Sequence, residues 1–196
     1  MEEQSRSALK EWAAIEQILA AGHSTILLRK GGIRERKRDF EVDHREFWLF
    51  PTHYHQNPDE LVPGFEWALE SGRAAEPDGD HVRIEHYAVV EDAFRVEDLE
   101  ALRRLEGLHP LEATTVESRF HYRDRLHLHV LVLRVHRVRE PYVIPNTLDY
   151  EGCISWVELD DPLSTVGSVP VLDDAAFEAA RREVAERLGE RGWERI

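Results

Sequence analysis

The hydrophobic and polar positions along the chain follow two different periods. Apolar residues recur at helical spacing between Ser5 and Ala21, and again behind the capping residues Asp173 and Asp174. Between these stretches, short apolar runs stop at polar or glycine-containing turns, as buried strands do. The predicted class is therefore α+β, with a β-rich central sheet or a small barrel flanked by N- and C-terminal helices.

The length of 196 residues suits one domain. We expect a single domain over 1–196, with an N-terminal helix over 1–22, a β-rich core over 23–160 and a C-terminal helix over 171–190. Runs typical of strands lie at 25–29, 38–42, 46–50, 82–96, 125–138 and 153–159. Shorter helices are expected after the capping residue Asn57, from 97 to 105 and from 112 to 116. Residues 130–133 are apolar on both faces, which indicates a central strand.

The net charge of −14 argues against a protein that coats nucleic acid without selectivity. The charge is, however, unevenly distributed. Windows 29–45 and 119–139 together hold thirteen basic and five acidic residues, a local excess of eight, so the rest of the chain carries −22. This asymmetry fits either solvated strands balanced by acidic helices or a basic groove on an acidic body.

Several classes of protein are excluded or disfavoured by composition. A single cysteine, Cys153, forms no internal disulfide and no thiolate zinc cluster, and it favours a reducing compartment. No run of about 18 apolar residues predicts a membrane span, so no membrane partner is expected. The first residues lack a secretory signal, and a cytoplasmic location is the expectation.

Two strand-to-loop transitions mark the candidate site. The apolar run that ends at Arg29 gives way to Lys30-Gly31-Gly32, and residues 47–50 give way to a loop rich in histidine. Glycine amides beside cationic side chains can form an anion nest, although an exposed basic hairpin has the same sequence pattern. The motif fits neither a Walker A loop nor a dinucleotide fingerprint. The predicted ligand-binding residues are Arg29, Lys30, Gly31, Gly32, Arg34, His53, His55, Gln56, Arg119 and Arg123.

The run 119–123 alternates cationic and aromatic side chains. Such a pattern suits backbone phosphates and stacked bases in proteins that bind single strands. The pattern also fits an amphipathic strand, with Phe120 and Tyr122 packed inward and the arginines in water. This second interpretation is slightly favoured.

Two His-x-His pairs raise the alternative of a divalent metal as cofactor. Residues i and i+2 of a strand face the same side, so His53 with His55, and His127 with His129, could each offer two imidazoles. A carboxylate such as Glu117 could complete the shell. His127 and His129 could instead border the core. No motif that defines a reaction occurs, and whether the chain is an enzyme stays open.

The sequence also resembles a known family. The residues that carry the resemblance are 8–12, 27–35, 50–56, 119–120, 131–134 and 152–156, so it spans nearly the whole chain. The family consists of uncharacterised bacterial proteins with a domain of unknown function, sometimes fused beside the N-terminal nuclease domain of type I restriction subunits. The resemblance implies a bacterial cytoplasmic protein with a link to DNA transactions, restriction or defence, and it supplies no catalytic residues. The order of elements is also similar to that of PUA-like RNA-binding barrels, an analogy of shape alone.

The leading hypothesis is a nucleic-acid-associated domain that binds a phosphate-bearing ligand, DNA or RNA, through a basic groove. On this hypothesis, Arg29→Glu combined with Arg34→Glu abolishes binding and leaves the melting temperature nearly unchanged. Two alternatives remain. One is a metal-dependent hydrolase or nuclease that uses the histidine pairs, and the other is a non-catalytic subunit that binds partners, restriction subunits among them, through exposed aromatics such as Trp67 and Trp193. The oligomeric state is left open.

Overall fold

The computed structural model describes residues 1–30, 44–122, 125–150, 152 and 154–196. Several predictions therefore lie outside the described residues. They concern the strand at 38–42 and the side chains Gly31, Gly32, Arg34, Arg123 and Cys153.

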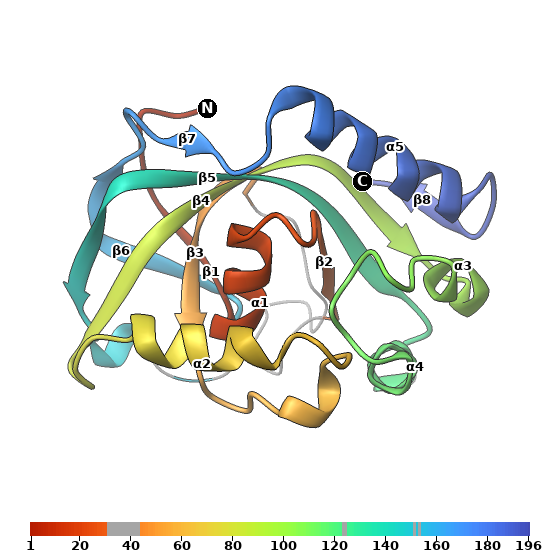
Figure 1. The fold of residues 1–196 in the computed structure, drawn as a ribbon, viewed down its shortest axis with the longest axis horizontal. Coiled ribbons are helices and arrows are strands. Elements are labelled where there is room, and N and C mark those ends of the chain that lie inside the picture. The colour runs from red at the N-terminus through yellow and green to blue at the C-terminus, as the bar shows by residue number, and fades with distance from the viewer. Residues whose placement is uncertain (31–43, 123–124, 151, 153) are drawn as a thin grey trace.

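The described chain builds one curved sheet of eight strands (Figure 1). The strands are β1 (Gln4–Trp12), β2 (Ile26–Arg29), β3 (Glu46–Thr52), β4 (His81–Val96), β5 (Leu128–Pro145), β6 (Trp156–Ser164), β7 (Val169–Pro170) and β8 (Trp193–Arg195). The main path runs β2-β5-β4-β3-β1-β6, with β7 added to β5 and β8 to β4. All pairs are antiparallel except β1 with β3, which are parallel.

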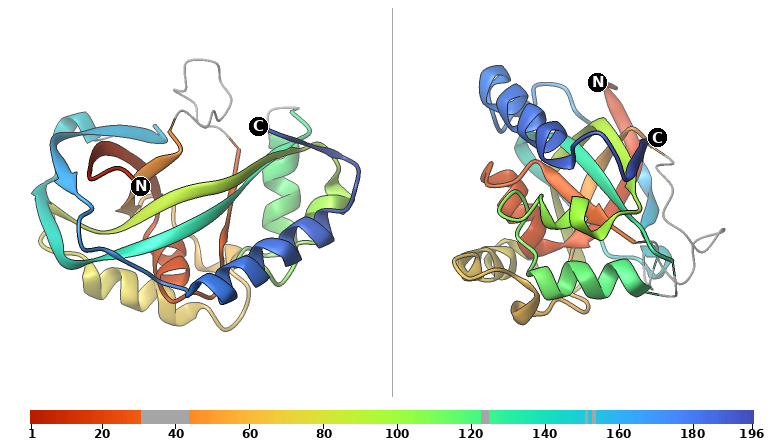
Figure 2. Two further views of the ribbon diagram at one scale, coloured as in Figure 1. Left: turned by 90° about the horizontal axis from the view of Figure 1, so that it is seen from above. Right: turned by 90° about the vertical axis from the view of Figure 1, so that its right-hand side faces the viewer.

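Helices lie on both sides of this sheet. They are α1 (Ala13–Ala20), α2 (Glu66–Ala75), α3 (Leu99–Arg103), α4 (Ala113–His121) and α5 (Asp174–Leu188), with 3₁₀ turns η1 (Pro58–Glu60) and η3 (Leu148–Tyr150). Figures 1 and 2 show β4 and β5 arching over α1, while α5 follows their outer side. Helices α1 and α2 pack closely at Gly72, where a Cβ atom would lie only 2.9 Å from that of Ala13. No described helix is long and apolar enough to span a bilayer.

The α+β class with a central sheet and flanking helices is confirmed. The C-terminal helix begins as expected, because the Asp173 carboxylate accepts a hydrogen bond from the backbone N–H of Ala176 at 2.8 Å. The central position of residues 130–133 is also confirmed, because β5 lies between β2 and β4 and these four side chains are buried.

The expected N-terminal helix is wrong over most of its length. Residues 4–12 form β1, and only 13–20 are helical. Strand β1 lies inside the sheet, where Ala8 is paired with Trp48 of β3 on one side and with Val157 of β6 on the other. These partners are far away in sequence, and the backbone pairing that they supply overrides the local helical spacing.

Three further expectations are corrected. Asn57 does cap a helical turn, but that turn is only η1, and the longer helix α2 begins at Glu66. Residues 119–121 are the last turn of α4 and not a strand. Strand β5 continues past Pro141, because this proline falls at the register shift opposite Glu85, where the ladder needs no N–H donor.

Candidate functional site

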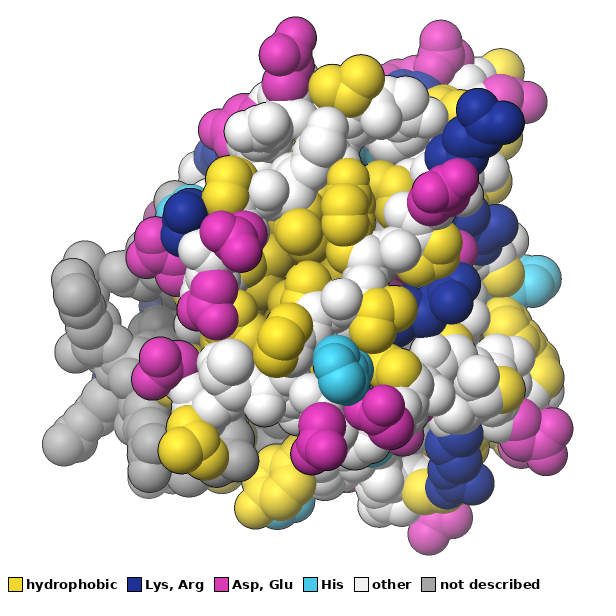
Figure 3. All heavy atoms as spheres, turned by 90° about the vertical axis from the view of Figure 1, so that its left-hand side faces the viewer, with side chains coloured by type: hydrophobic (Ala, Val, Ile, Leu, Met, Phe, Trp, Pro, Cys, Tyr) yellow, Lys and Arg dark blue, Asp and Glu magenta, His cyan; other side chains and the backbone are white. Residues whose placement is uncertain are grey.

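A cleft of about 1350 Å³ opens between the inner helices and the sheet. Its walls come from α1, α2 and α4 and from the ends of β2, β3 and β4, where strands give way to loops. Figure 3 shows a hollowed face on the side where β4 begins and β5 ends, with hydrophobic side chains on its floor and carboxylates around its rim. Phe50, Val82 and Tyr150 are among the apolar residues of the cleft.

Five of the predicted ligand-binding residues line the cleft. They are Arg29, Lys30, His53, His55 and Arg119. Gln56 has a different role, because its side-chain oxygen accepts a hydrogen bond from the backbone N–H of Ala14 at 3.0 Å and so caps the first turn of α1. The other predicted members lie outside the described residues.

Arg29 is built into the wall of the cleft. Its guanidinium donates to the Glu11 carboxylate at 2.8 Å and to the Ser155 hydroxyl at 2.7 Å, and its side chain is only 16% exposed. It also donates to the backbone carbonyl of Lys10 at 3.2 Å. The charge of Arg29 is therefore compensated by Glu11, and the side chain braces β1 against β2 and the segment that leads into β6.

Lys30 also lines the cleft, but its ammonium is bonded to backbone carbonyls. Its ammonium donates to the carbonyls of Phe120 at 2.9 Å, of His127 at 2.8 Å and of Arg125. An ammonium has three protons, and these three carbonyls can take all of them. Lys30 thereby ties the end of β2 to the C-terminal end of α4 and to the chain that enters β5.

Arg119 and its neighbours form the aromatic part of the cleft. The Arg119 guanidinium lies over the Trp12 ring at 5.0 Å from its centroid and reaches Glu60 at 3.4 Å. Phe120 is buried, as the inward-packing interpretation expected, but it is buried from a helix. Tyr54 and Tyr122 also line the cleft, with 66% and 44% of their surface exposed.

The helix α4 adds a row of hydroxyl groups to the same wall. Thr114, Ser118 and Tyr122 follow each other at intervals of four residues, so they share one face of the helix and its continuation. All three line the cleft. Hydroxyls both donate and accept hydrogen bonds, so this face suits an uncharged polar group.

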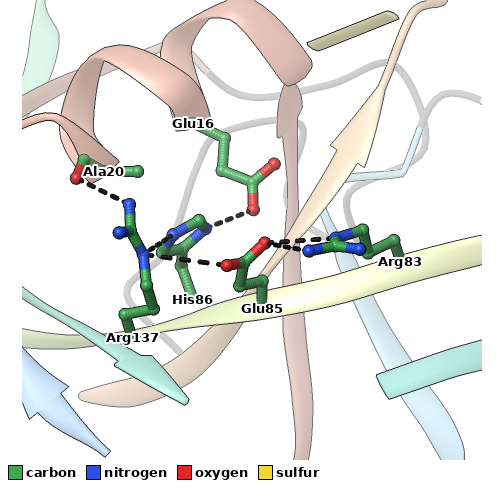
Figure 4. A network of polar contacts seen from close by, with 6 residues as sticks. All are labelled: Glu16, Ala20, Arg83, Glu85, His86 and Arg137. Atoms are coloured by element: carbon green, nitrogen blue, oxygen red, sulfur yellow. Dashed lines mark hydrogen bonds and ion pairs between the residues drawn. The ribbon is translucent and has the colours of Figure 1, made fainter. Parts of the chain in front are cut away.

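Glu16 of the cleft lining begins a polar chain through His86 to Arg137, and the sequence interpretation missed it (Figure 4). The Nδ1 atom of His86 lies 2.9 Å from Oε1 of Glu16, and the Nε group of Arg137 donates to His86 Nε2 at 3.2 Å. Arg137 also donates to the backbone carbonyl of Ala20 at 3.2 Å. The available signal was Glu16 itself, the one charged residue in the largely apolar stretch 13–20 of a helix.

The hydrogen-bond pattern fixes the form of His86. Because Nε2 accepts from Arg137, it carries no proton, and Nδ1–H donates to Glu16. His86 is therefore a neutral imidazole and not the cation of an ion pair. Burial raises the pKa of Glu16, and the hydrogen bond from His86 opposes that rise without cancelling it.

This geometry predicts that Glu16→Gln stabilises the protein near neutral pH. A carboxyl whose pKa is higher in the folded than in the unfolded chain contributes stability below its unfolded pKa of about 4.3 and loses it as pH rises. Glutamine avoids the burial of a charge and still accepts from His86. We expect the free energy of unfolding to rise by about 1 kcal/mol at pH 7, which raises the melting temperature of a chain of this size by about 2–4 °C. The difference should be smaller at pH 4. Paired thermal melts at both pH values measure this, and a gain that grows on acidification would contradict it.

The structure does not bring the two histidine pairs together. His53 and His55 follow the end of β3 at Thr52, so the same-face argument for a strand does not apply to them, and His53 Nε2 lies 3.3 Å from a carboxylate oxygen of Glu76. His127 and His129 have ring centroids 5.3 Å apart, and His127 lines a separate pocket of about 520 Å³. Among the described residues no group of three or more His, Cys, Asp and Glu side chains is arranged to hold a metal ion.

The charge of the described cleft lining is mixed. Six carboxylates face five lysine and arginine side chains. The cations Arg29, Lys30 and Arg119 lie around β2 and α4, and the Lys10 ammonium lies beside the carbonyls of Tyr150 and Gly152; we call these four the basic group. Three of the carboxylates lie on α1, directly after α2 and on β4, and we call Glu16, Glu76 and Glu85 the acidic group. The cleft lining is thus mixed in charge rather than uniformly basic, because Arg29, Arg83 and Arg119 each have a carboxylate partner.

Comparison with solved structures finds similar proteins of very low identity. The ASCH protein of Zymomonas mobilis is 12% identical, with a TM-score of 0.42 over 92% of this chain and 93% of that one. Two point mutants of the same protein are 13% and 15% identical, with TM-scores of 0.45 and 0.44. The first mutant structure covers 81% of this chain and 91% of its own, and the second covers 78% and 88%. No curated protein matches the chain significantly.

The match to a protein family is more extensive. It covers residues 8–183 and so includes the second half of β1, the whole cleft and most of α5. The resemblance to an uncharacterised domain family is thereby confirmed, while no finding supports a fusion with a nuclease domain or a link to restriction. The chain belongs to the family described as Domain of unknown function (DUF1802).

Proposed function

We propose that the protein binds single-stranded nucleic acid, with an unpaired base in the cleft and the adjoining phosphate beside the basic group. The observation that carries this proposal is the combination of Arg119 stacked on Trp12 with the exposed rings of Tyr54 and Tyr122, all in one cleft. Aromatic and guanidinium planes stack on bases that are not paired. The hydroxyl row of α4 supplies hydrogen-bonding groups beside these planes.

The cations of the basic group already have partners within the protein, and this limits how strongly binding can depend on salt. Arg29 is neutralised by Glu11, and the ammonium of Lys30 is held by backbone carbonyls. Few phosphate counterions are then released on binding, and the acidic body of the protein discourages further contacts. We expect the logarithm of the affinity to fall with the logarithm of salt concentration with a slope of about −1, as for one or two phosphates.

The test is fluorescence anisotropy with labelled single strands and duplexes of DNA and RNA from low to physiological salt. Tyr54→Ala and Tyr122→Ala should each weaken single-strand binding about fivefold or more, because stacking on one base contributes about 1–3 kcal/mol. Both side chains are exposed enough that truncation leaves the core intact. Val169→Ala is the matched control, since Val169 is 60% exposed on β7 and is not part of the cleft lining.

Two outcomes would contradict the proposal. Duplexes that bind as tightly as single strands would show that no unpaired base is needed. Tyrosine variants that bind as well as the Val169→Ala control would show that the cleft is not the site.

A further inference from the structure

Glu16 presents one carboxylate oxygen to the cleft. The side chain is 4% exposed, yet it belongs to the cleft lining. Oε1 is taken by His86 at 2.9 Å, and in Figure 4 the second oxygen points away from His86. A carboxyl more than nine-tenths buried, with one acceptor oxygen uncommitted, is costly unless a donor meets it.

The described surroundings of Glu16 contain no cation that neutralises it directly. His86 is neutral, and Arg137 donates its hydrogen bonds to His86 and to the carbonyl of Ala20. No described lysine or arginine lies within ion-pair distance of Glu16. Arg83 is occupied by Glu85, with donor–acceptor distances of 3.1 and 3.0 Å. The uncommitted oxygen of Glu16 is therefore complementary to a ligand group that donates an N–H.

Resting on the proposed function, we propose that Glu16 accepts a hydrogen bond from the exocyclic amino group of cytosine, so that the cleft distinguishes cytosine from uracil. Cytosine presents its N4 amino donor where uracil presents the O4 acceptor, and carboxylates accept from N4. In a uracil complex, O4 would face a carboxylate oxygen, and two acceptors would be buried together without a proton between them.

The single uncommitted oxygen also argues against guanine. Guanine offers two adjacent N–H donors on its Watson–Crick edge, which match a carboxylate with both oxygens available. Oε1 of Glu16 is already engaged by His86. Adenine, like cytosine, presents an amino donor beside a ring-nitrogen acceptor, so the adenosine hexamer in the experiment below decides between these two bases.

The experiment compares single-stranded RNA hexamers of cytidine, uridine and adenosine at pH 7.5 by competition in fluorescence anisotropy. The protein should bind the cytidine hexamer about tenfold more tightly than the uridine hexamer. Glu16→Gln should bring this ratio close to one, because an amide can donate to uracil O4 as well as accept from cytosine N4. Its amide oxygen still accepts from His86, so the fold is retained. Glu16→Asp, which withdraws the carboxylate by one methylene, should also lower the ratio.

The matched control is Glu117→Gln, the same chemical change at a side chain of α4 that is 49% exposed and outside the cleft lining. It should keep the wild-type ratio. Equal affinities of the wild type for cytidine and uridine, a ratio retained by both Glu16 variants, or tighter binding of adenosine would each overturn the inference and leave the proposed function standing. Binding of none of the RNA hexamers, nor of the matching DNA hexamers, would overturn both.

Discussion

Replacing Arg29 with glutamate is expected to lower the melting temperature by about 10 °C or more. The substitution should thus destabilise the fold, rather than abolish ligand binding by a protein that stays folded. The substitution removes donors to Glu11 and Ser155 and sets a second carboxylate against Glu11, which is itself buried. Breaking a buried ion pair costs about 3–5 kcal/mol, and each kcal/mol shifts the melting temperature of a chain of this size by about 2–4 °C. Thermal unfolding followed by circular dichroism measures the shift.

Two further variants identify the cause of that loss. Glu11→Gln should relieve part of the repulsion in the Arg29→Glu background, because an amide can donate to the new carboxylate. Arg29→Met combined with Glu11→Leu should be more stable than Arg29→Met alone, because no charge is then buried without a partner. If Arg29→Glu melts with the wild type and binds no nucleic acid, Arg29 is the exposed cation that the sequence pattern suggested.

The second large effect is expected for Lys30→Met, which should cost about 3 kcal/mol. Methionine keeps the length of the side chain but leaves the carbonyls of Phe120, Arg125 and His127 without their common donor. Hydrogen bonds to a charged group contribute about 1.5–3 kcal/mol each, and the loss is partly offset because no ammonium must be desolvated. Urea unfolding monitored by tryptophan fluorescence gives the free energy.

Lys10→Met provides the comparison for that experiment. Among the described residues the Lys10 ammonium donates to two carbonyls, those of Tyr150 and Gly152, where Lys30 donates to three. Its substitution should cost less than that of Lys30. A Lys30→Met protein of wild-type stability with weakened binding would instead assign Lys30 to the ligand.

The local sequence pattern predicts those strands and helices whose own residues show the expected periodicity, turn residues or cap. Strands β2, β3, β4 and β5 consist of apolar or alternating runs bounded by turn residues, and α5 has a capping aspartate and an apolar stripe. Strand β1 has no such signal, because Leu9 and Trp12 are spaced as a continuation of the α1 stripe. Only the two neighbouring strands, 40 or more residues away, decide its conformation.

The same limit applies to the cleft. Strand-to-loop transitions were sufficient to single out Arg29 and His53, which the structure brings into one cleft, whereas Arg119 reaches that cleft from helix α4. Their roles were not predictable, since the partners of Arg29 lie 18 and 126 residues away in the sequence. The Glu16–His86 contact spans 70 residues, and neither residue belongs to a motif.

The register shift in β4 determines how the chemistry of this cleft can vary among relatives. Side chains of adjacent strand residues normally point to opposite faces, yet Glu85 and His86 both reach Arg137, at 3.7 and 3.2 Å. The irregularity that allows this lies between Ile84 and His86. Deleting one residue there would turn Val82 and Ile84 outward and Arg83 into the core. Homologous chains should therefore diversify this wall by substitution at constant length, and gaps in their alignment should avoid 84–86.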